Sequence, residues 1–303
     1  MRLKSSRLTP KRWWKNHRIR VQQTVLVLVL LIVSGGLWTY ESAFRYRNEL
    51  RIWFFDIGQG DSAFIETPDG HQILIDGGPD RDILTKLGQV MLPWDRTIDV
   101  VIGTHPDADH IGGLAGVLQQ YEVTTIVSNG DKKSTAVAAG FFEARDSEPG
   151  ATLVTGRLGN SIRFGEVLLT QLWPTEDAVE DPDTNIGSIV YRLDYHDTSV
   201  VLMGDATESV EQAIQASVGE VDVIKLGHHG SVTSSSYDFL QSAHPEEVVI
   251  SCGVDNRYGH PHPAVISRLW DLGIEIYRTD KDGDLLLTSD GGDPWIHRSP
   301  LPF

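Results

Sequence analysis

Cysteine is nearly missing from this chain, which has a single one, Cys252, among its 303 residues. A lone cysteine cannot form an internal disulfide bond, and it provides no set of thiolate ligands for a metal. Because Cys252 follows the apolar residues Val249 and Ile250, we expect it to be a small residue of the hydrophobic core. A single thiol is compatible with a reducing or an oxidising compartment.

Basic residues are scarce outside the N-terminal segment of a chain whose formal charge is −16. Residues 1–20 carry eight Lys or Arg residues and no acidic residue, so the remainder has 18 basic against 42 acidic residues, a net charge of −24. Proteins that bind nucleic acid usually present a basic surface. The acidic remainder therefore counts against a polyanionic substrate unless metal ions and a local basic strip outweigh it.

Three motifs of other enzyme classes are also missing. The sequence has no G-x-S-x-G nucleophile elbow, no G-x-x-x-x-G-K-[ST] phosphate loop and no G-x-G-x-x-G dinucleotide fingerprint. Residues 50–303 also lack an internal repeat, a low-complexity tract and a long linker, which predicts a single domain.

The segment Thr24–Tyr40 contains no charged residue. As a helix it would be about 26 Å long, close to the thickness of a bilayer core. Trp38 and Tyr40 lie where interfacial aromatic residues are expected, and the preceding basic cluster predicts a cytoplasmic N-terminus. We therefore expect a basic cytoplasmic tail (1–20), a transmembrane anchor (21–40), a connector (41–49) and a catalytic domain (50–303).

This anchor would make the protein a single-pass component of the cell (inner) membrane, with its catalytic domain outside the cytoplasm. A cleaved signal peptide is an alternative, because Ser34-Gly35-Gly36 offers small residues at a cleavage point. The long basic segment and the lack of an A-x-A sequence favour the anchor over the signal peptide. A buried core helix is the third possibility.

The domain alternates between strand and helix patterns. We expect helices at 82–87, 111–121, 135–145, 209–218, 237–243 and 264–272. We expect strands at 51–57, 63–67, 72–75, 98–103, 123–127, 162–164, 167–172, 189–194, 199–203, 221–226, 248–252, 274–278 and 285–288. Two β-rich halves, each closed by helices, predict an α/β fold of two mixed sheets packed face to face with helices outside.

The stretch Thr104–Gly113 (THPDADHIGG) concentrates two imidazoles and two carboxylates in six residues. Such groups repel one another and order badly unless a cation gathers them, which predicts a metal site. In an extended loop alternate residues point the same way, so His105, Asp107 and Asp109 can share a face. His110, at the entrance of the expected helix, would turn in beside them.

Six ordered motifs carry a family resemblance: FDIGQGDS (55–62), LIDGG (74–78), THPDADHIGG (104–113), MGD (203–205), KLGHHGS (225–231) and NRYGHP (256–261). The set resembles the metallo-β-lactamase superfamily and, more closely, the hydrolase domain of ComEC-type competence DNA-uptake proteins. The resemblance covers about residues 50 to 290. It implies an αββα sandwich with a dinuclear metal site at the sheet edge that hydrolyses ester-type bonds, here in the DNA strand that is not imported.

The resemblance also implies a ligand set. His105 and Asp107 would hold one ion, Asp109 and His110 the second, and Asp205 would bridge both. His228 or His229 would complete the second site, and the sequence leaves open which one binds the metal and which contacts a phosphate. The usual third His of the first site has no evident counterpart, although Asn185 or Ser188 lies in the corresponding region.

Further residues are expected around this centre. Asp76, at a strand end, is predicted to orient a ligand His through a hydrogen bond. Asp61, Asn256, Tyr258 and His260 are predicted to line the substrate pocket, with His260 binding phosphate or protonating the leaving group. Asp109, Asp205 and His260 are therefore the candidate catalytic residues, and the alternative for Asp205 is an N-cap of the helix that follows.

The ligand set contains carboxylates and imidazoles but no thiolate, which makes Mn²⁺ or Mg²⁺ a competitor to Zn²⁺. We expect two divalent ions, Mn²⁺ or Zn²⁺. Two such ions can activate water and stabilise charge on the attacking and leaving oxygens, so phosphodiester cleavage needs no protein nucleophile.

The first functional hypothesis is a membrane-anchored, extracytoplasmic phosphodiesterase or DNase that acts on single-stranded DNA or another phosphodiester beside a DNA-uptake machine. Two alternatives are a hydrolase of a small phosphodiester, such as a phosphorylcholine ester, or of a lactone, and a non-catalytic, metal-stabilised binding scaffold. Two features depart from the competence proteins and the wider superfamily. The chain has one apolar segment where the channel proteins carry many membrane helices, and Asp107 replaces the second His of the superfamily's usual H-x-H-x-D-H. No oligomeric state is predicted.

Overall fold

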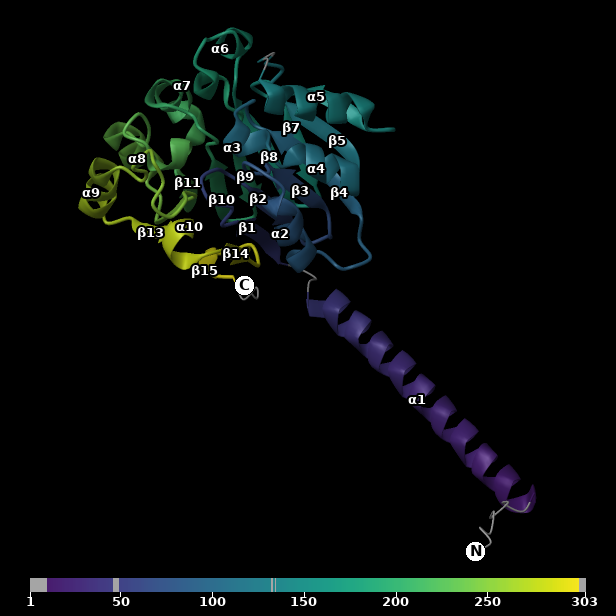
Figure 1. Ribbon diagram of the computed structural model, residues 1–303. Coiled ribbons are helices and arrows are strands. Elements are labelled where there is room, and N and C mark those ends of the chain that lie inside the picture. The colour runs from purple at the N-terminus through teal and green to yellow at the C-terminus, as the bar shows by residue number, and fades with distance from the viewer. Residues whose placement is uncertain (1–9, 46–48, 132, 134, 300–303) are drawn as a thin grey trace, which may run out of the picture. The chain divides into compact units, whose positions relative to one another are not determined.

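The computed structural model describes residues 10–45, 49–131, 133 and 135–299. The chain divides into two units, Met1–Arg47 and Asn48–Phe303. The first unit contains one long helix, α1 (Pro10–Arg45) (Figure 1). Within α1 the window Arg20–Leu37 is long and apolar enough to cross a membrane, and its residues are exposed. A signal sequence shares these properties. Residues 1–9 of the expected tail and 46–48 of the expected connector lie outside the described residues.

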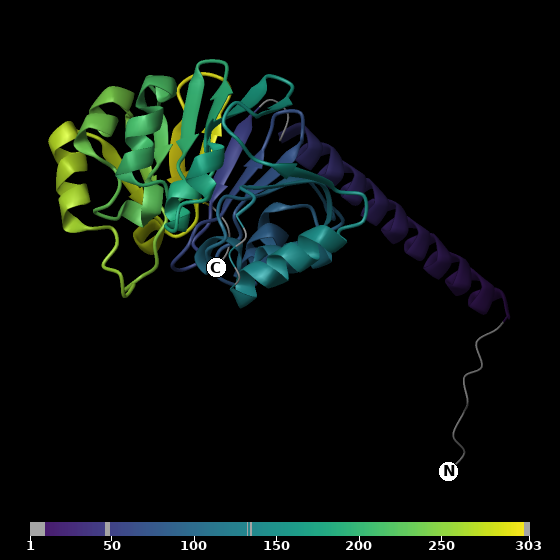
Figure 2. The same ribbon diagram turned by 90° about the horizontal axis from the view of Figure 1, so that it is seen from above.

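The second unit is built around two β-sheets that lie face to face (Figure 2). The first sheet has the strand order β15-β14-β1-β2-β3-β4-β5-β6, and the second has β13-β12-β11-β10-β9-β8-β7. The strands of the first sheet are β1 (Leu50–Phe54), β2 (Ala63–Glu66), β3 (Gln72–Ile75), β4 (Thr97–Gly103), β5 (Glu122–Ser128), β6 (Thr152–Thr155), β14 (Leu285–Ser289) and β15 (Trp295–Arg298). The strands of the second are β7 (Ser161–Phe164), β8 (Val167–Trp173), β9 (Val190–Tyr195), β10 (Thr198–Leu202), β11 (Val223–Lys225), β12 (Glu247–Ile250) and β13 (Glu275–Arg278).

Each sheet combines parallel and antiparallel pairs. In the first sheet β3, β4, β5 and β6 run parallel to one another, and the remaining pairs are antiparallel. In the second sheet β10 to β13 run parallel and β7 to β10 antiparallel. The carboxyl ends of parallel strands meet at one edge of a sheet. Loops from distant parts of the chain are therefore brought together at that edge.

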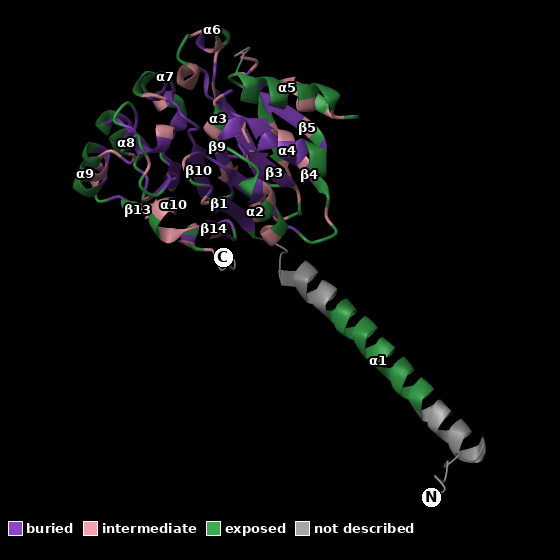
Figure 3. Ribbon diagram, viewed as in Figure 1, coloured by how far each residue is buried: buried purple, intermediate pink, exposed green. Residues whose placement is uncertain are grey.

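The outer faces of both sheets are covered by helices (Figures 1 and 3). The helices of the second unit are α2 (Asp82–Val90), α3 (Ala108–Ile111), α4 (Leu114–Gln120), α5 (Ala136–Ser147), α6 (Glu176–Val179), α7 (Glu208–Val218), α8 (Tyr237–Ala243), α9 (Pro263–Leu272) and α10 (Thr279–Asp282), with two short turns, η1 (Thr184–Gly187) and η2 (Gly227–Gly230). Apolar side chains of α2, α4 and α5 pack on the first sheet, and those of α7, α8 and α9 pack on the second.

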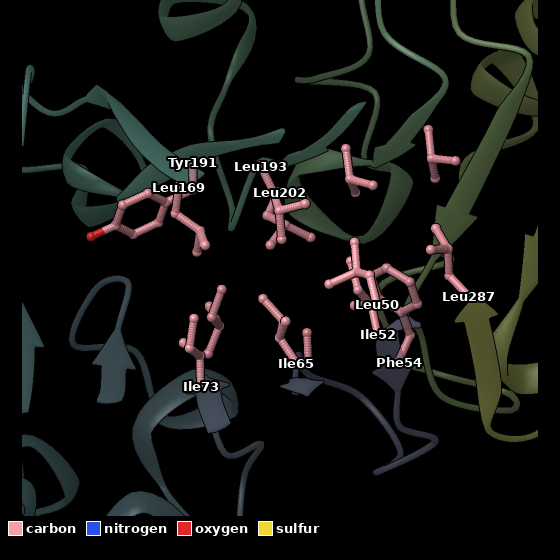
Figure 4. Packing of buried hydrophobic residues seen from close by; sticks show 14 of the residues in the cluster. Leu50, Ile52, Phe54, Ile65, Ile73, Leu169, Tyr191, Leu193, Leu202 and Leu287 are labelled. Atoms are coloured by element: carbon pink, nitrogen blue, oxygen red, sulfur yellow. The ribbon is translucent and has the colours of Figure 1, made fainter. Parts of the chain in front are cut away.

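The central core lies between the two sheets (Figure 4). Ile52, Ile65 and Ile73 of the first sheet face Leu193 and Leu202 of the second, and all five are buried. Burying one such side chain stabilises the fold by roughly 1.5–3 kcal/mol. The αββα sandwich expected from the sequence is confirmed.

Cys252 is a free, buried thiol in the cluster beneath α7, α8 and α9, as its apolar neighbours predict. Strands β6 and β15 were not expected from the sequence. Both are short edge strands in which most residues are partly or fully exposed. Neither therefore needs the run of apolar residues by which the buried strands were predicted. The helix expected at 111–121 is split, because α3 already begins at Ala108 and Gly112–Gly113 separates it from α4.

Candidate metal centre

The candidate ligands follow the carboxyl ends of strands in both sheets. Asp76 comes directly after β3, and His105 comes two residues after β4. In the second sheet Asp205 follows β10, and His229 follows β11 through the turn η2. Because β3 and β4 run parallel, as do β10 and β11, these loops meet at the same sandwich edge.

Asp205 lies at the centre of three buried imidazoles. Its carboxylate is 3.2 Å from Nε2 of His110, 3.6 Å from Nε2 of His229 and 4.0 Å from Nε2 of His105. Asp205 is 4% exposed, and the three imidazoles are 1% exposed or less. Asp109, which is half-buried, lies 3.5 Å from Nε2 of His229.

The polar atoms that face one another here lack hydrogen-bond partners. Nε2 of His105, His110 and His229 and Oδ1 of Asp205 are all buried, and none of them has a hydrogen-bond partner among the described residues. Burying several such atoms without partners is costly, so they mark a position for a ligand. Two of the metal-binding groups within these residues are His105–His110–Asp205 and Asp109–His110–His229. The donor atoms in each group lie within 4.8 Å of one another, so the residues present fit a divalent cation.

The electrostatics of this cluster are dominated by burial and by mutual attraction. Burial and the neighbouring His110 lower the pKa of His105 to about 4. Burial would also lower the pKa of His229, but the carboxylates of Asp205 and Asp61 raise it to about 9. Burial opposes ionisation of Asp205, yet His229 and His110 hold its pKa well below the ordinary value. Burial also opposes protonation of His110, but Asp205 and Asp76 raise its pKa well above the ordinary value. Protons on His110 and His229 thus balance the carboxylates, and a bound cation would replace them.

Asp76 fixes His110 and the loop that carries His105. Its Oδ2 lies 2.8 Å from Nδ1 of His110 and accepts a 2.7 Å hydrogen bond from the Thr104 hydroxyl. Its Oδ1 accepts from the Thr104 backbone N–H at 2.8 Å. The backbone of Asp76 has a φ of +59°, an uncommon conformation that often occurs at functional sites.

The two histidines of η2 have different surroundings. His229 is buried, with Nδ1 3.0 Å from the Ser251 carbonyl oxygen and Nε2 facing Asp109 and Asp205. The side chain of His228 is 26% exposed, and its Nδ1 lies 3.1 Å from the Thr233 hydroxyl. Both residues have positive φ values, 48° and 54°. His229 is thus buried among the candidate ligands, whereas His228 lies at the rim, with its Nε2 4.0 Å from Asp205.

The structure does not bring Asp107 into the cluster. Its Oδ1 accepts hydrogen bonds from Lys133 Nζ at 2.6 Å and from the Thr184 hydroxyl at 2.8 Å, and it belongs to none of the metal-binding groups among the described residues. Ser188 reaches the centre differently, because its hydroxyl lies 3.1 Å from Nδ1 of His105 and accepts from the Asp205 N–H at 3.2 Å. Asn185 is half-buried in η1 and also lies outside these groups.

A rigid loop forms one rim of the centre. Asn256 donates to the carbonyl oxygens of Gly253 and His260 at 2.9 and 2.6 Å, and it accepts from the His260 N–H at 3.0 Å. The ring of His260 contacts the His228 ring edge-on and stacks on Tyr258, with centroids 5.6 and 5.9 Å away.

Tyr258 is 52% exposed, and the Arg257 guanidinium lies 4.8 Å from the centre of its ring. Both residues line a cleft of about 840 Å³ that Asp109 also lines. The rim thus presents an exposed aromatic ring and a cation beside the candidate ligands.

Four residues around this centre were not predicted as site residues from the sequence: Thr104, Lys133, Lys225 and Arg257. Lys225 is buried and contacts Asp61, whose other oxygen lies 3.2 Å from Nδ1 of His229. Its place as the first residue of the KLGHHGS motif was the available signal, but a lysine at a strand end is usually solvated.

A family model described as the metallo-beta-lactamase superfamily matches residues 55–254. Among curated proteins, ComE operon protein 3 of Bacillus subtilis is 30% identical in a 267-residue alignment that covers 78% of this chain and 33% of that protein. Competence protein ComA of Neisseria gonorrhoeae is 29% identical in a 262-residue alignment that covers 84% of this chain and 34% of that protein. Recombination protein 2 of Haemophilus influenzae is 28% identical in a 275-residue alignment that covers 89% of this chain and 32% of that protein. The chain spans about a third of the length of these relatives.

Solved structures share the fold. The metallo-beta-lactamase fold protein YhfI from Bacillus subtilis superposes with a TM-score of 0.53 at 15% identity, covering 82% of this chain and 99% of that one. A putative metal-dependent hydrolase from Parabacteroides distasonis gives a TM-score of 0.50 at 15% identity, covering 76% and 94%. At these identities the likeness establishes the arrangement of the two sheets and their helices.

Proposed function

Because the chain belongs to the metallo-β-lactamase superfamily, we propose that it is a membrane-anchored, extracytoplasmic hydrolase that uses two divalent ions to cleave phosphodiester bonds in single-stranded DNA. Its family, its fold and its candidate metal site are those of a metal-dependent hydrolase. The observation that carries the proposal is the convergence of three unpaired imidazole nitrogens on the carboxylate of Asp205.

We assign the ligands by the direction of these donor atoms. Asp109, His110 and His229 would hold one ion, His105 the other, and Asp205 both. Asp107 would join His105 by exchanging its present contact with Lys133 for the ion. The donors are imidazoles and carboxylates without a thiolate, a set that suits Mn²⁺ or Zn²⁺.

When bound, a pair of divalent ions supplies an activated water near neutral pH and stabilises negative charge on phosphoryl oxygens. The protein's own residues do the positioning. Asp76 fixes the ring of His110 through Nδ1, and Ser188 and Thr104 hold Nδ1 of His105 at 3.1 Å each. Each imidazole thereby presents Nε2 to the centre.

His260 stands beside His228 at the mouth of the centre. Burial and the nearby imidazoles of His228 and His229 lower its pKa to about 4, so it is neutral at physiological pH. A neutral imidazole can accept a hydrogen bond from a substrate hydroxyl or donate one to a phosphoryl oxygen. We assign His260 to contact with the phosphate or the leaving group.

Two observations support DNA as the substrate. Two of the curated relatives are named as a recombination protein and a competence protein. The rim places Arg257 over the exposed ring of Tyr258 in the cleft next to Asp109, and an aromatic face with a neighbouring cation is typical of single-stranded nucleic-acid binding. An uptake machine that exposes one DNA strand would supply such a substrate.

A smaller substrate is the second candidate, and the charge of the cleft favours it. The same cleft is lined by four carboxylates, those of Asp56, Asp80, Asp82 and Asp109, against the single cation of Arg257. A polyanion is repelled by such a surface, whereas a small phosphodiester or a lactone is repelled less.

The proposed location depends on helix α1. Residues 21–40 would form the anchor, with residues 1–20 in the cytoplasm and the domain from residue 50 outside it. Protease accessibility of the domain in intact spheroplasts, compared with permeabilised ones, tests this arrangement. Protection in intact spheroplasts would contradict it.

The activity is tested with the full chain purified in detergent and loaded with Mn²⁺ or Zn²⁺. We expect degradation of single-stranded DNA and its loss in Asp109→Ala. Inactivity on every form of DNA by a protein with bound metal, together with turnover of bis-p-nitrophenyl phosphate or a lactone, would favour the smaller substrate. Less than one bound metal per chain and no hydrolysis would favour a binding scaffold.

A further inference from the structure

A lysine lies buried beneath the candidate metal ligands. Lys225 is the last residue of β11 and is 4% exposed. Its Nζ contacts Oδ2 of Asp61, which is 5% exposed, and lies 3.4 Å from the carbonyl oxygen of Gly204, next to Asp205. A buried lysine is rare and needs a charged partner. Asp61 is that partner.

Asp61 connects this lysine to His229. Its Oδ1 lies 3.2 Å from Nδ1 of His229, whose Nε2 on the opposite side of the ring faces Asp109 and Asp205. The backbone N–H of Asp61 also donates to the Asp109 carbonyl oxygen at 3.1 Å. Nδ1 of His229 also lies 3.0 Å from the Ser251 carbonyl oxygen, so two acceptors flank this side of the ring, and of the two only Asp61 is charged and contacts Lys225.

Asp61 is itself close enough to bind a metal. It belongs to two of the groups whose donor atoms lie within 4.8 Å of one another, Asp61–Asp205–His229 and Asp61–Asp76–His110. An oxygen that binds a metal can no longer orient His229 in the same way. A fixed cation on the other oxygen of Asp61 weakens its attraction for a second cation.

We propose that the Lys225 ammonium is a cation built into the metal centre that holds Asp61 beside His229 and keeps Asp61 out of the ligand set. Lys225 is thus a positioning residue that acts through Asp61. The proposal rests on the proposed function only in requiring that the centre binds divalent ions. It does not depend on DNA being the substrate.

The test measures affinity for Mn²⁺ and Zn²⁺, and the number of ions per chain, in the full chain and its variants. In Lys225→Met the carboxylate of Asp61 is free to bind the metal, and the ammonium that repels the metal cation is removed. We expect it to bind Mn²⁺ at least about tenfold more tightly than the wild type. A lysine that only stabilised the fold would not increase metal affinity when removed.

The double variant Asp61→Asn/Lys225→Met removes both buried charges, so it keeps the fold even if the single variant does not. We expect it to bind the ion held by His229 about 10- to 100-fold more weakly, because the carboxylate that orients the imidazole is lost. Lys225→Arg is unsuitable, since the cavity beside Lys225 has a volume of about 20 Å³, room for one water only.

Lys86 and Asp284 provide a matched control. Lys86 Nζ lies 2.9 Å from Asp284, and their side chains are 21% and 11% exposed. We expect Lys86→Met/Asp284→Asn to bind metal like the wild type. The proposal is overturned if folded Lys225→Met binds Mn²⁺ no more tightly than the wild type, or if the Asp61/Lys225 double variant matches the wild type. If the wild type itself bound no metal, the proposed function would fail as well.

Discussion

Oδ2 of Asp76 and Nδ1 of His110 lie 2.8 Å apart in a buried contact between the end of β3 and the helical turn α3. The contact directs Nε2 of His110 at Asp205, 3.2 Å away. Since a carboxylate on the far nitrogen of an imidazole orients the ring and strengthens it as a ligand, we expect Asp76 to support metal binding through His110.

Asp76→Asn should therefore weaken metal binding by about 10- to 100-fold while the fold survives. Asn tolerates the positive φ of this position, so the backbone need not change. Metal titration and thermal unfolding of the same samples check this. Asp76→Ala, which combines loss of the acceptor with backbone strain, should also be less stable. Wild-type metal affinity in Asp76→Asn would show that the contact is irrelevant to the centre.

Replacing each of the two histidines of η2 by Ala should affect a different property, metal binding for His229 and turnover for His228. His229→Ala removes the nitrogen that faces Asp109 and Asp205, so we expect metal affinity to fall by more than the roughly 10- to 100-fold that loss of an outer hydrogen-bond partner costs. His228→Ala should retain the wild-type number of ions per chain and lose turnover. Metal analysis after dialysis distinguishes the two variants. The reverse pattern would assign the ligand to His228.

The sequence predicted the fold and the meeting of its motifs because both depend on strand order. Asp76, His105 and Asp205 each follow a strand, and the carboxyl ends of parallel strands gather them whatever the details of packing. The choice between His228 and His229 was not predictable. It depends on two consecutive positive φ values, and the Gly residues that flank the pair allow either ring to point inward.

Lys225 and Asp107 show a second limit of sequence patterns. Lys225 is paired with a residue 164 positions earlier in the chain, and no local period or spacing reveals such a contact. Alternation in an extended loop predicts that His105 and Asp107 share a face, and their sharing of one ion stays a prediction. The sequence did not predict that Lys133 and Thr184 donate hydrogen bonds to the Asp107 carboxylate.

Gly60 is needed where two loops of the centre touch. Its φ is +146°, and a Cβ there would collide with the Asp109 carbonyl oxygen. Gly60→Ala should cost about 1–3 kcal/mol of stability and displace Asp109, with a parallel loss of metal affinity. Gly88→Ala is the control, because a Cβ at this exposed helical position meets nothing within 4 Å. It should stabilise the protein by about 0.5–1 kcal/mol. Equal effects of the two changes on metal binding would contradict this account.

The pH dependence of stability should contain a contribution from Glu247. Burial and the opposing Glu275 on the neighbouring strand raise the pKa of Glu247 to about 7. The folded state therefore holds this proton more tightly than the unfolded state, whose pKa is near the ordinary 4.5. The stabilisation is complete below pH 4.5 and is lost as the pH rises through 7.

Glu247→Gln should accordingly lose less stability than the wild type between pH 5 and pH 8, as measured by urea unfolding at both values. Glu122→Gln, an exposed change at the start of β5, serves as the control and should follow the wild type. A pH response of Glu247→Gln identical to that of the wild type would refute the assignment.

Tyr258 offers the sharpest distinction between DNA and a small substrate. Its ring is 52% exposed beside Arg257, and stacking of one base on an aromatic ring contributes about 1–3 kcal/mol. A small phosphodiester bound at the metals has no base to stack. Tyr258→Ala should therefore lower kcat/KM for single-stranded DNA by about 5- to 150-fold, mainly through KM, and leave unchanged the hydrolysis of a phosphorylcholine ester that carries no aromatic ring.

Trp295→Ala is the matched control, because this aromatic side chain on the edge strand β15 is 65% exposed. It should alter neither activity. Equal losses on both substrates in Tyr258→Ala would mean that the ring supports the metal centre through His260, on which it stacks. If Tyr258→Ala hydrolysed DNA at the wild-type rate, the rim around Tyr258 would not be part of the DNA-binding site. The acidic lining of the cleft would then favour the smaller substrate.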